Sequence, residues 1–156
     1  MFYRVKQFFL AVFAKLTEED YDFINEYLNE EDKLLFNSLP THEKKHCINV
    51  ATFVRNNNTV DNKFIKAALL HDIGKRNSGL NPIFKGIIVI MNKISEKATR
   101  KLQFIKPIRV YYNHPYIGYE IYKDIDEEIA YIIKNHHNYS CDNKIVKIIQ
   151  EADCKN

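Results

Sequence analysis

Residues 67–75 read AALLHDIGK, and they form the end of a predicted helix. Apolar side chains recur here with the three- and four-residue spacing of one helix face, and the pattern extends back to Phe64. His71 stands seven residues after Phe64, so it falls on the same apolar face. The pair His71 and Asp72 therefore lies at a helix end, where a turn lets both side chains and the ammonium group of Lys75 approach one cavity.

Start and stop signals place this helix and the others along the chain. Asp61 can cap the helix, which runs from about Asn62 to Ile73, and Gly74 is its expected stop. No strand alternation of useful length is present, so the predicted fold is all-α. The other predicted helices are one from Thr17 to about Leu28, a short third one, one from His42 to about Arg55 capped by Thr41, one or two over 82–105, a short one over Tyr116 to Tyr122, one that Asp126 opens and that carries His136, and a last one from about Asp142 to the end.

The N-terminal stretch MFYRVKQFFLAVFAK superficially resembles a signal peptide. Its apolar run is short and lacks a convincing cleavage site, so an amphipathic first helix is favoured. The expected apolar face holds Val5, Phe8, Phe9, Val12 and Phe13.

Composition limits the classes of protein that the chain can belong to. A length of 156 residues fits one domain, and the net charge of +3 is spread without the basic block of an obligate nucleic-acid binder. The stretch from Ile83 to Ile94 contains Lys85 and Asn92 and is too short to span a bilayer. We therefore expect no stable nucleic-acid partner and no membrane partner. Three cysteines without a CxxC pair indicate a reducing cytoplasm: Cys47, Cys141 and Cys154.

The residues with metal-binding chemistry are six histidines and two carboxylates. Imidazole and carboxylate are the ligands of divalent transition metals, and burying several of them is costly unless a cation compensates. A single histidine on an apolar face is more often a hydrogen-bonded core residue, so the inference depends on the combination. The candidates are His42, His46, His71, His114, His136, His137, Asp72 and Asp153.

The run AALLHDIGK resembles the HD-domain superfamily, whose ligands follow the order His, His-Asp, further His, then Asp. The resemblance covers about Thr41 to Asp153. It implies an all-helical bundle with a core over 41–153, within a single domain over 1–156 whose residues 1–40 form N-terminal helices packed on that core. The motifs that carry the resemblance are HCINVA with His46, HDIGK with His71 and Asp72, NHPYIGYEI with His114, IIKNHHN with His136 and His137, and QEADC with Asp153.

The resemblance also implies a function and a role for each residue. The chain would hydrolyse a phosphomonoester or phosphodiester of a small nucleotide-like compound through a metal-activated hydroxide. The first metal would be held by His46, His71, Asp72 and Asp153. Asp72 would bridge to a second metal bound by His114, with His136 and His137 completing it. One or two ions of Fe, Mn, Ni, Co or Zn suit these ligands equally.

The residues expected to be essential for catalysis are Asp72 and Lys75. Lys75 could donate to a phosphate oxygen of the substrate. The alternative for Lys75 is a solvated cation that favours the helix dipole. His42 stands where relatives with three metals carry a carboxylate, so a third metal is not expected, and His42 would support the ligands or lie on the surface.

Alternatives to hydrolysis and to packing remain open from the sequence. The domain could bind a nucleotide as a regulator without hydrolysis, or a di-iron pair could carry out oxidation. Cys47 and Cys141 are expected to be packing residues and not ligands. The tyrosine-rich stretch around His114 is expected to pack in the core, although a surface that stacks on a base is conceivable.

Overall fold

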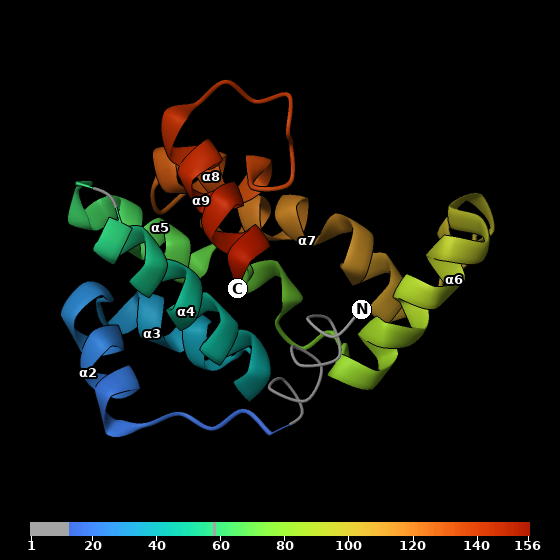
Figure 1. Cartoon of the computed structure of the whole chain (residues 1–156), viewed down its shortest axis with the longest axis horizontal. Helices are drawn as coiled ribbons and strands as arrows, with labels where there is room; N and C mark the ends of the chain where they lie inside the picture. Colours follow the sequence, from blue (N-terminus) through green and yellow to red (C-terminus); the bar gives the residue numbers. More distant parts are fainter. Residues whose placement is uncertain (1–12, 58) are drawn as a thin grey trace.

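The computed structural model describes residues 13–57 and 59–156, and the regular elements of this part of the chain are all helices (Figure 1). No strand occurs in it, which confirms the predicted all-α fold. The elements are α2 Glu18–Tyr27, α3 Glu30–Asn37, α4 Thr41–Asn57, α5 Asn62–Leu70, the 3-10 helix η1 Ile73–Lys75, α6 Pro82–Arg100, α7 Lys106–Tyr122, α8 Glu127–Asn135 and α9 Lys144–Lys155.

Capping side chains define most helix starts. Thr17 and Asp20 form a capping box at α2, and Asp61 and Asp126 accept backbone N–H groups at the starts of α5 and α8, as predicted. Thr41, which was expected to be a cap, is the first residue of α4. The predicted first helix concerns residues outside the described part, apart from Phe13, which is exposed.

Gly74 does not stop α5, contrary to the prediction. The helix ends at Leu70, and Gly74 lies inside η1. A Cβ atom at this position would stand 2.0 Å from the carbonyl oxygen of His114 and 2.8 Å from the backbone nitrogen of Gly118. Gly74 therefore allows η1 to approach the backbone of α7, which brings the segment of Asp72 beside His114.

The predicted short helix after His114-Pro115 is also wrong. A single helix, α7, runs from Lys106 to Tyr122 with Pro115 in its interior. Proline ordinarily disrupts a helix because it has no N–H for the carbonyl four residues earlier. Here that carbonyl, of Tyr111, accepts a hydrogen bond from the His114 ring at 3.1 Å instead. Because this polar group is satisfied, one cost of an internal proline is removed.

The larger hydrophobic cluster lies where α4, α5, α8 and α9 pack together, with α2 against α4 and α5 (Figure 1). Its fully buried members include Phe36, Leu69, Ile133 and Ile149. Cys47 and Cys141 belong to it, as predicted for packing residues. The helix ends that carry the candidate ligands border this cluster.

A smaller cluster lies between α6 and the first half of α7. It contains Leu80, Ile88 and Ile108, with Tyr111 and Tyr112 packed against it. In Figure 1, α6 stands at the right edge of the molecule, away from α4, α5, α8 and α9. We call α6 with the first half of α7 the α6 arm.

A helix that crosses a bilayer needs about 20 predominantly apolar residues. Among residues 13–57 and 59–156, no helix combines the length and the apolarity that crossing a membrane requires.

Candidate metal centre

Asp72 lies at the centre of a cluster of imidazole rings. It lies between His71, the C-cap of α5, and the start of η1, and it is 1% exposed. Its Oδ2 faces the Nε2 atoms of His71 and His46, at 3.4 and 3.8 Å. Its Oδ1 faces the Nε2 atoms of His114 and His136, at 3.2 and 3.6 Å. Each carboxylate oxygen therefore has its own pair of histidines, which is the arrangement of a bridging ligand.

Asp153 and His137 complete the cluster. The Asp153 Oδ1 atom lies 2.9 Å from the Nε2 of His46, and its Oδ2 lies 3.8 Å from the Nδ1 of His137. All seven side chains that were predicted as ligands thus lie in one cluster, although they come from α4, α7, α9 and the ends of α5 and α8.

Three of the histidines share one backbone arrangement. His71, His114 and His136 each have Nδ1 within hydrogen-bond distance of the carbonyl oxygen three residues earlier, at 2.7, 3.1 and 2.6 Å. A carbonyl only accepts, so these contacts require a proton on Nδ1 and leave Nε2 as a lone pair in the neutral ring. Histidines that bind a metal through one ring nitrogen typically donate a hydrogen bond from the other nitrogen in this way.

The carbonyl oxygens that accept these bonds are free for two different reasons. The carbonyls of Ala68 and Ile133 belong to the last turns of α5 and α8, where no further helical N–H follows. The carbonyl of Tyr111 is free because Pro115 has no N–H. Helix ends and one proline thus orient the three rings toward Asp72.

Buried polar atoms without partners indicate that the cluster suits a cation. The Nε2 of His71 and the Oδ1 of Asp72 are buried and make no hydrogen bond. The Nε2 atoms of His114 and His136 lie 3.3 Å apart, and with both Nδ1 atoms protonated two lone pairs face each other. A cation between them would relieve this repulsion. The donor atoms form two compact groups that fit one ion each, namely His46, His71, Asp72 and His114, His136, His137.

The protonation states of the buried groups follow from their surroundings. Burial alone would raise the pKa of Asp72, but the charges of Lys75 and His71 outweigh it and hold the pKa well below its ordinary value. Burial lowers the pKa of His136 to about 4. Burial alone would also lower the pKa of His71, but Asp72 raises it well above the ordinary value. At neutral pH, therefore, Asp72 is ionised and the His136 ring is neutral, as ligands must be, whereas a metal competes with a proton at His71.

Lys75 is buried against two carboxylates. Its Nζ donates to Asp72 Oδ2 at 2.6 Å and to Glu43 Oε2 at 3.1 Å, and the residue is 5% exposed. Because Lys75 is buried, the alternative interpretation from the sequence, that Lys75 is a solvated cation at a helix end, is wrong. An ammonium group has three N–H donors, so these two bonds leave one for another acceptor.

Glu43 was not recognised from the sequence. It lies on α4 three residues before His46, on the same helix face, and that spacing was the available signal. His42 has its Nε2 3.4 Å from Glu43 Oε1, and neither atom makes a hydrogen bond. His42 therefore lies beside Glu43 and not among the ligands of Asp72.

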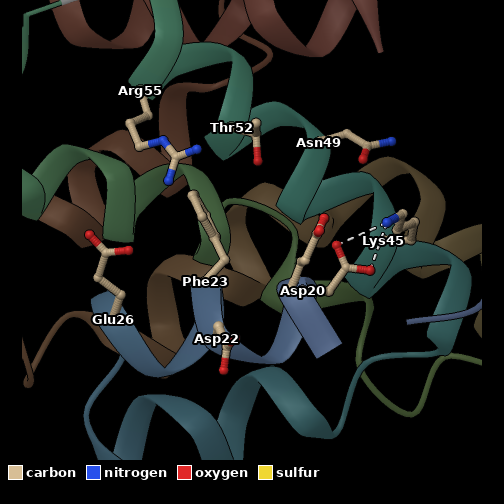
Figure 2. Close-up of a pocket in the computed structure, with 9 residues that line it drawn as sticks. Asp20, Asp22, Phe23, Glu26, Lys45, Asn49, Thr52 and Arg55 are labelled. Carbon is tan, nitrogen blue, oxygen red and sulfur yellow. Dashed lines mark hydrogen bonds and ion pairs between the residues drawn. The ribbon is translucent and has the colours of Figure 1, made fainter. Parts of the chain in front are cut away.

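A separate hollow lies between α2 and α4 (Figure 2). One ion pair lies in this hollow, where Lys45 donates to both carboxylate oxygens of Asp20 at 2.9 and 2.6 Å. Arg55 lies 4.8 Å above the ring of Phe23. None of the nine residues that line this hollow is a predicted ligand, so the hollow is separate from the cluster around Asp72.

The chain resembles a known protein family over most of its length. The family model described as HD domain matches residues 44–155. This range includes all seven candidate ligands, and Glu43 stands immediately before it. No curated protein and no solved structure matches the chain.

Proposed function

The chain belongs to the HD-domain family, and from this premise we propose that it is a metal-dependent phosphohydrolase that cleaves a phosphomonoester or phosphodiester of a small nucleotide-like compound. The observation that carries the proposal is the position of Asp72. Its two oxygens face two separate pairs of imidazole nitrogens, and one carboxylate shared between two groups of ligands suits a pair of divalent cations.

The division of the ligands follows from these contacts. His46, His71 and Asp153 would hold one cation with Asp72, whereas His114, His136 and His137 would hold the second. When bound, divalent cations supply Lewis acidity that makes water a stronger nucleophile and offsets the negative charge of the phosphoryl group in the transition state. Asp72 would hold the two cations at a fixed separation, because each of its oxygens faces one of the two groups of ligands.

Lys75 would bind the substrate through its remaining N–H group. Its pKa is raised because Asp72 and Glu43 outweigh the effect of burial, so it stays charged throughout the physiological range. Glu43 and Asp72 hold the Nζ atom in a fixed place, and a charged donor of this kind suits a phosphate oxygen. Glu43 acts through Lys75 and is therefore a positioning residue.

The free thiols agree with a cytoplasmic location, which we include in the proposal. Cys47 and Cys141 are buried and unpaired, and Cys154 is exposed and unpaired. Exposed free thiols persist in reducing compartments.

The test begins with metal analysis of the purified chain. The recovered metal would then be used in a panel of nucleoside monophosphates, dinucleoside polyphosphates, cyclic dinucleotides and simple phosphodiesters. Phosphate or nucleotide release from a member of the panel would support the proposal. A bound metal with no hydrolysis would favour regulatory binding, and oxygen consumption by an iron-containing protein would favour an oxidase.

Asp72→Asn tests the bridging role, because it keeps the size of the side chain and removes its charge. We expect loss of bound metal and a fall in turnover of at least about a thousandfold. Asp142→Asn is the matched control, since Asp142 is exposed and pairs with Lys147 away from the centre. Lys75→Ala should retain metal and slow turnover. Full metal content and normal turnover in Asp72→Asn would refute the proposal.

A further inference from the structure

The outer face of α6 carries a stripe of exposed isoleucines. Ile83, Ile87, Ile90 and Ile94 are 60%, 46%, 61% and 82% exposed. Their spacing of four, three and four residues places them on one helix face. The opposite face packs inward through Ile88, which is fully buried. The stripe is therefore separate from the core of the α6 arm, and a continuous row of this kind differs from scattered surface apolar residues.

The segment that contains α6 and the start of α7 is strongly basic. Residues 82–109 hold seven basic residues and one acidic residue, a net charge of +6, whereas the whole chain carries +3. The remainder of the chain is therefore net negative. Lys93, Lys97 and Lys101 are exposed, and within the described ranges no carboxylate lies at ion-pair distance from them. Lys93 stands between Ile90 and Ile94 on the first part of α6, whereas Lys97 and Lys101 follow a kink at Ser95, whose backbone is not helical. Positive charge therefore lies at the C-terminal end of the isoleucine stripe and in the segment that follows it.

We propose that the part of α6 before the kink, residues 82–94, is a membrane-surface helix that binds an anionic lipid bilayer. The isoleucine stripe would enter the boundary between headgroups and acyl chains, and the flanking lysines would contact lipid phosphates. Helices with an apolar face and lysines on the polar side bind in this way, parallel to the membrane plane. Such binding needs no spanning helix, so it revises only the expectation that the chain has no membrane partner.

Charge also decides between a bilayer and a second copy of the chain. A symmetric dimer through α6 would place the same basic segment of each protomer against the other, and like charges at close range oppose association. An anionic bilayer supplies the complementary charge together with an apolar layer beneath it. The chemistry of the α6 arm thus favours lipid.

Vesicle flotation of the full chain tests the proposal. We expect the protein to float with vesicles of phosphatidylcholine and phosphatidylglycerol, and much less with phosphatidylcholine alone. Ile90→Asn combined with Ile94→Asn should lower the vesicle partition coefficient by at least about tenfold, because two apolar anchors are lost. Leu34→Asn is the matched control, since Leu34 is 76% exposed on α3, and it should bind like the parent protein.

Lysine variants test the electrostatic part. Lys93→Gln and Lys97→Gln should each weaken binding to anionic vesicles by about fivefold. Lys144→Gln, at the exposed start of α9, is the control and should change little. Added salt should weaken binding of the parent protein, because it screens exposed charges.

Three results would overturn the proposal. The first is no flotation with anionic vesicles. The second is a dimer in solution that the isoleucine variant dissociates, which would make a second copy the occupant of the stripe. The third is a large fall in melting temperature of the isoleucine variant without vesicles, which would show that another part of the chain covers the stripe.

Discussion

The bundle around Asp72 and the α6 arm use their surfaces in opposite ways. In the bundle, charged and polar side chains are buried against one another, as with Lys75 between Asp72 and Glu43. In the arm, the large apolar side chains of Ile90 and Ile94 stay exposed, and the exposed Lys93 stands between them on α6. Burial of charge is costly unless partners or a cation offset it, and exposure of an apolar row is costly unless something covers it. Each region therefore suits a partner that the chain itself does not supply. The bundle around Asp72 suits a metal cation, and the α6 arm suits an apolar, negatively charged surface.

Substitution of one glycine in each region gives the largest expected difference in the free energy of unfolding. Gly74→Ala would place Cβ 2.0 Å from a backbone oxygen of α7, which cannot move like a side chain, so we expect a loss of roughly 3 kcal/mol or more in the free energy of unfolding. Gly86→Ala in α6 meets no atom within 4 Å and should stabilise by up to about 1 kcal/mol. Chemical denaturation measures both. Equal effects of the two substitutions would contradict the comparison.

Metal removal should affect the bundle and leave the arm unchanged. Ligands from five elements are joined only in the folded chain, so metal binding stabilises the folded state. In protein first shown to contain metal, chelation should lower the melting temperature by roughly 5–10 °C. Chelation should lower the melting temperature of the variant with Ile90→Asn and Ile94→Asn by the same number of degrees. An unchanged melting temperature after chelation would show that the cluster does not bind the metal.

Acidification should separate the two groups of ligands. The raised pKa of His71 means that its ring keeps a proton to a higher pH than an ordinary histidine, and a metal must displace that proton. Affinity at the group of His46, His71 and Asp72 should therefore fall by up to about tenfold for each pH unit below that pKa. His136, with its pKa lowered to about 4, stays available as pH falls toward that value.

Metal content after dialysis at a series of pH values measures this difference. One metal should leave before the other as the pH falls. Simultaneous loss, or an affinity that rises on acidification, would refute the assignment of the groups.

Pro115 should matter for metal binding more than for helix stability. Pro115→Ala restores an N–H that competes with the His114 ring for the Tyr111 carbonyl. We expect the affinity of the group containing His114 to fall by about tenfold, while the metal-free protein melts at the same or a higher temperature. Pro107→Ala is the control, because Pro107 lies in the first turn of α7, where no carbonyl is released. Equal metal affinity of the two variants would show that Pro115 does not influence metal binding through the His114 ring.

Local sequence patterns were sufficient for the helical class and most of its boundaries. Caps such as Asp61 and Asp126 act within a few residues, so their chemistry can be predicted without the fold. The order of histidines and aspartates predicted the members of the cluster for a different reason, namely the resemblance to a family. The structure brings all seven together.

Predictions from local patterns were wrong where a contact outside the local pattern determined the conformation of a residue. Pro115 stands inside a helix because the His114 ring uses the carbonyl that it releases. Gly74 is required by the nearby backbone of α7 and not by the end of α5. Propensities describe a residue in its own segment and contain no information about which segment will lie against it.

The sequence by itself determined an all-helical chain and a set of imidazoles and carboxylates at helix ends and on apolar faces, because these follow from periodicity and side-chain chemistry. Only the tertiary structure decided that each oxygen of Asp72 faces its own pair of rings, that Glu43 holds Lys75, and that the isoleucines of α6 stay outside. Contacts between segments far apart in the chain depend on how the helices pack, and packing combines many weak interactions that no short stretch of sequence contains.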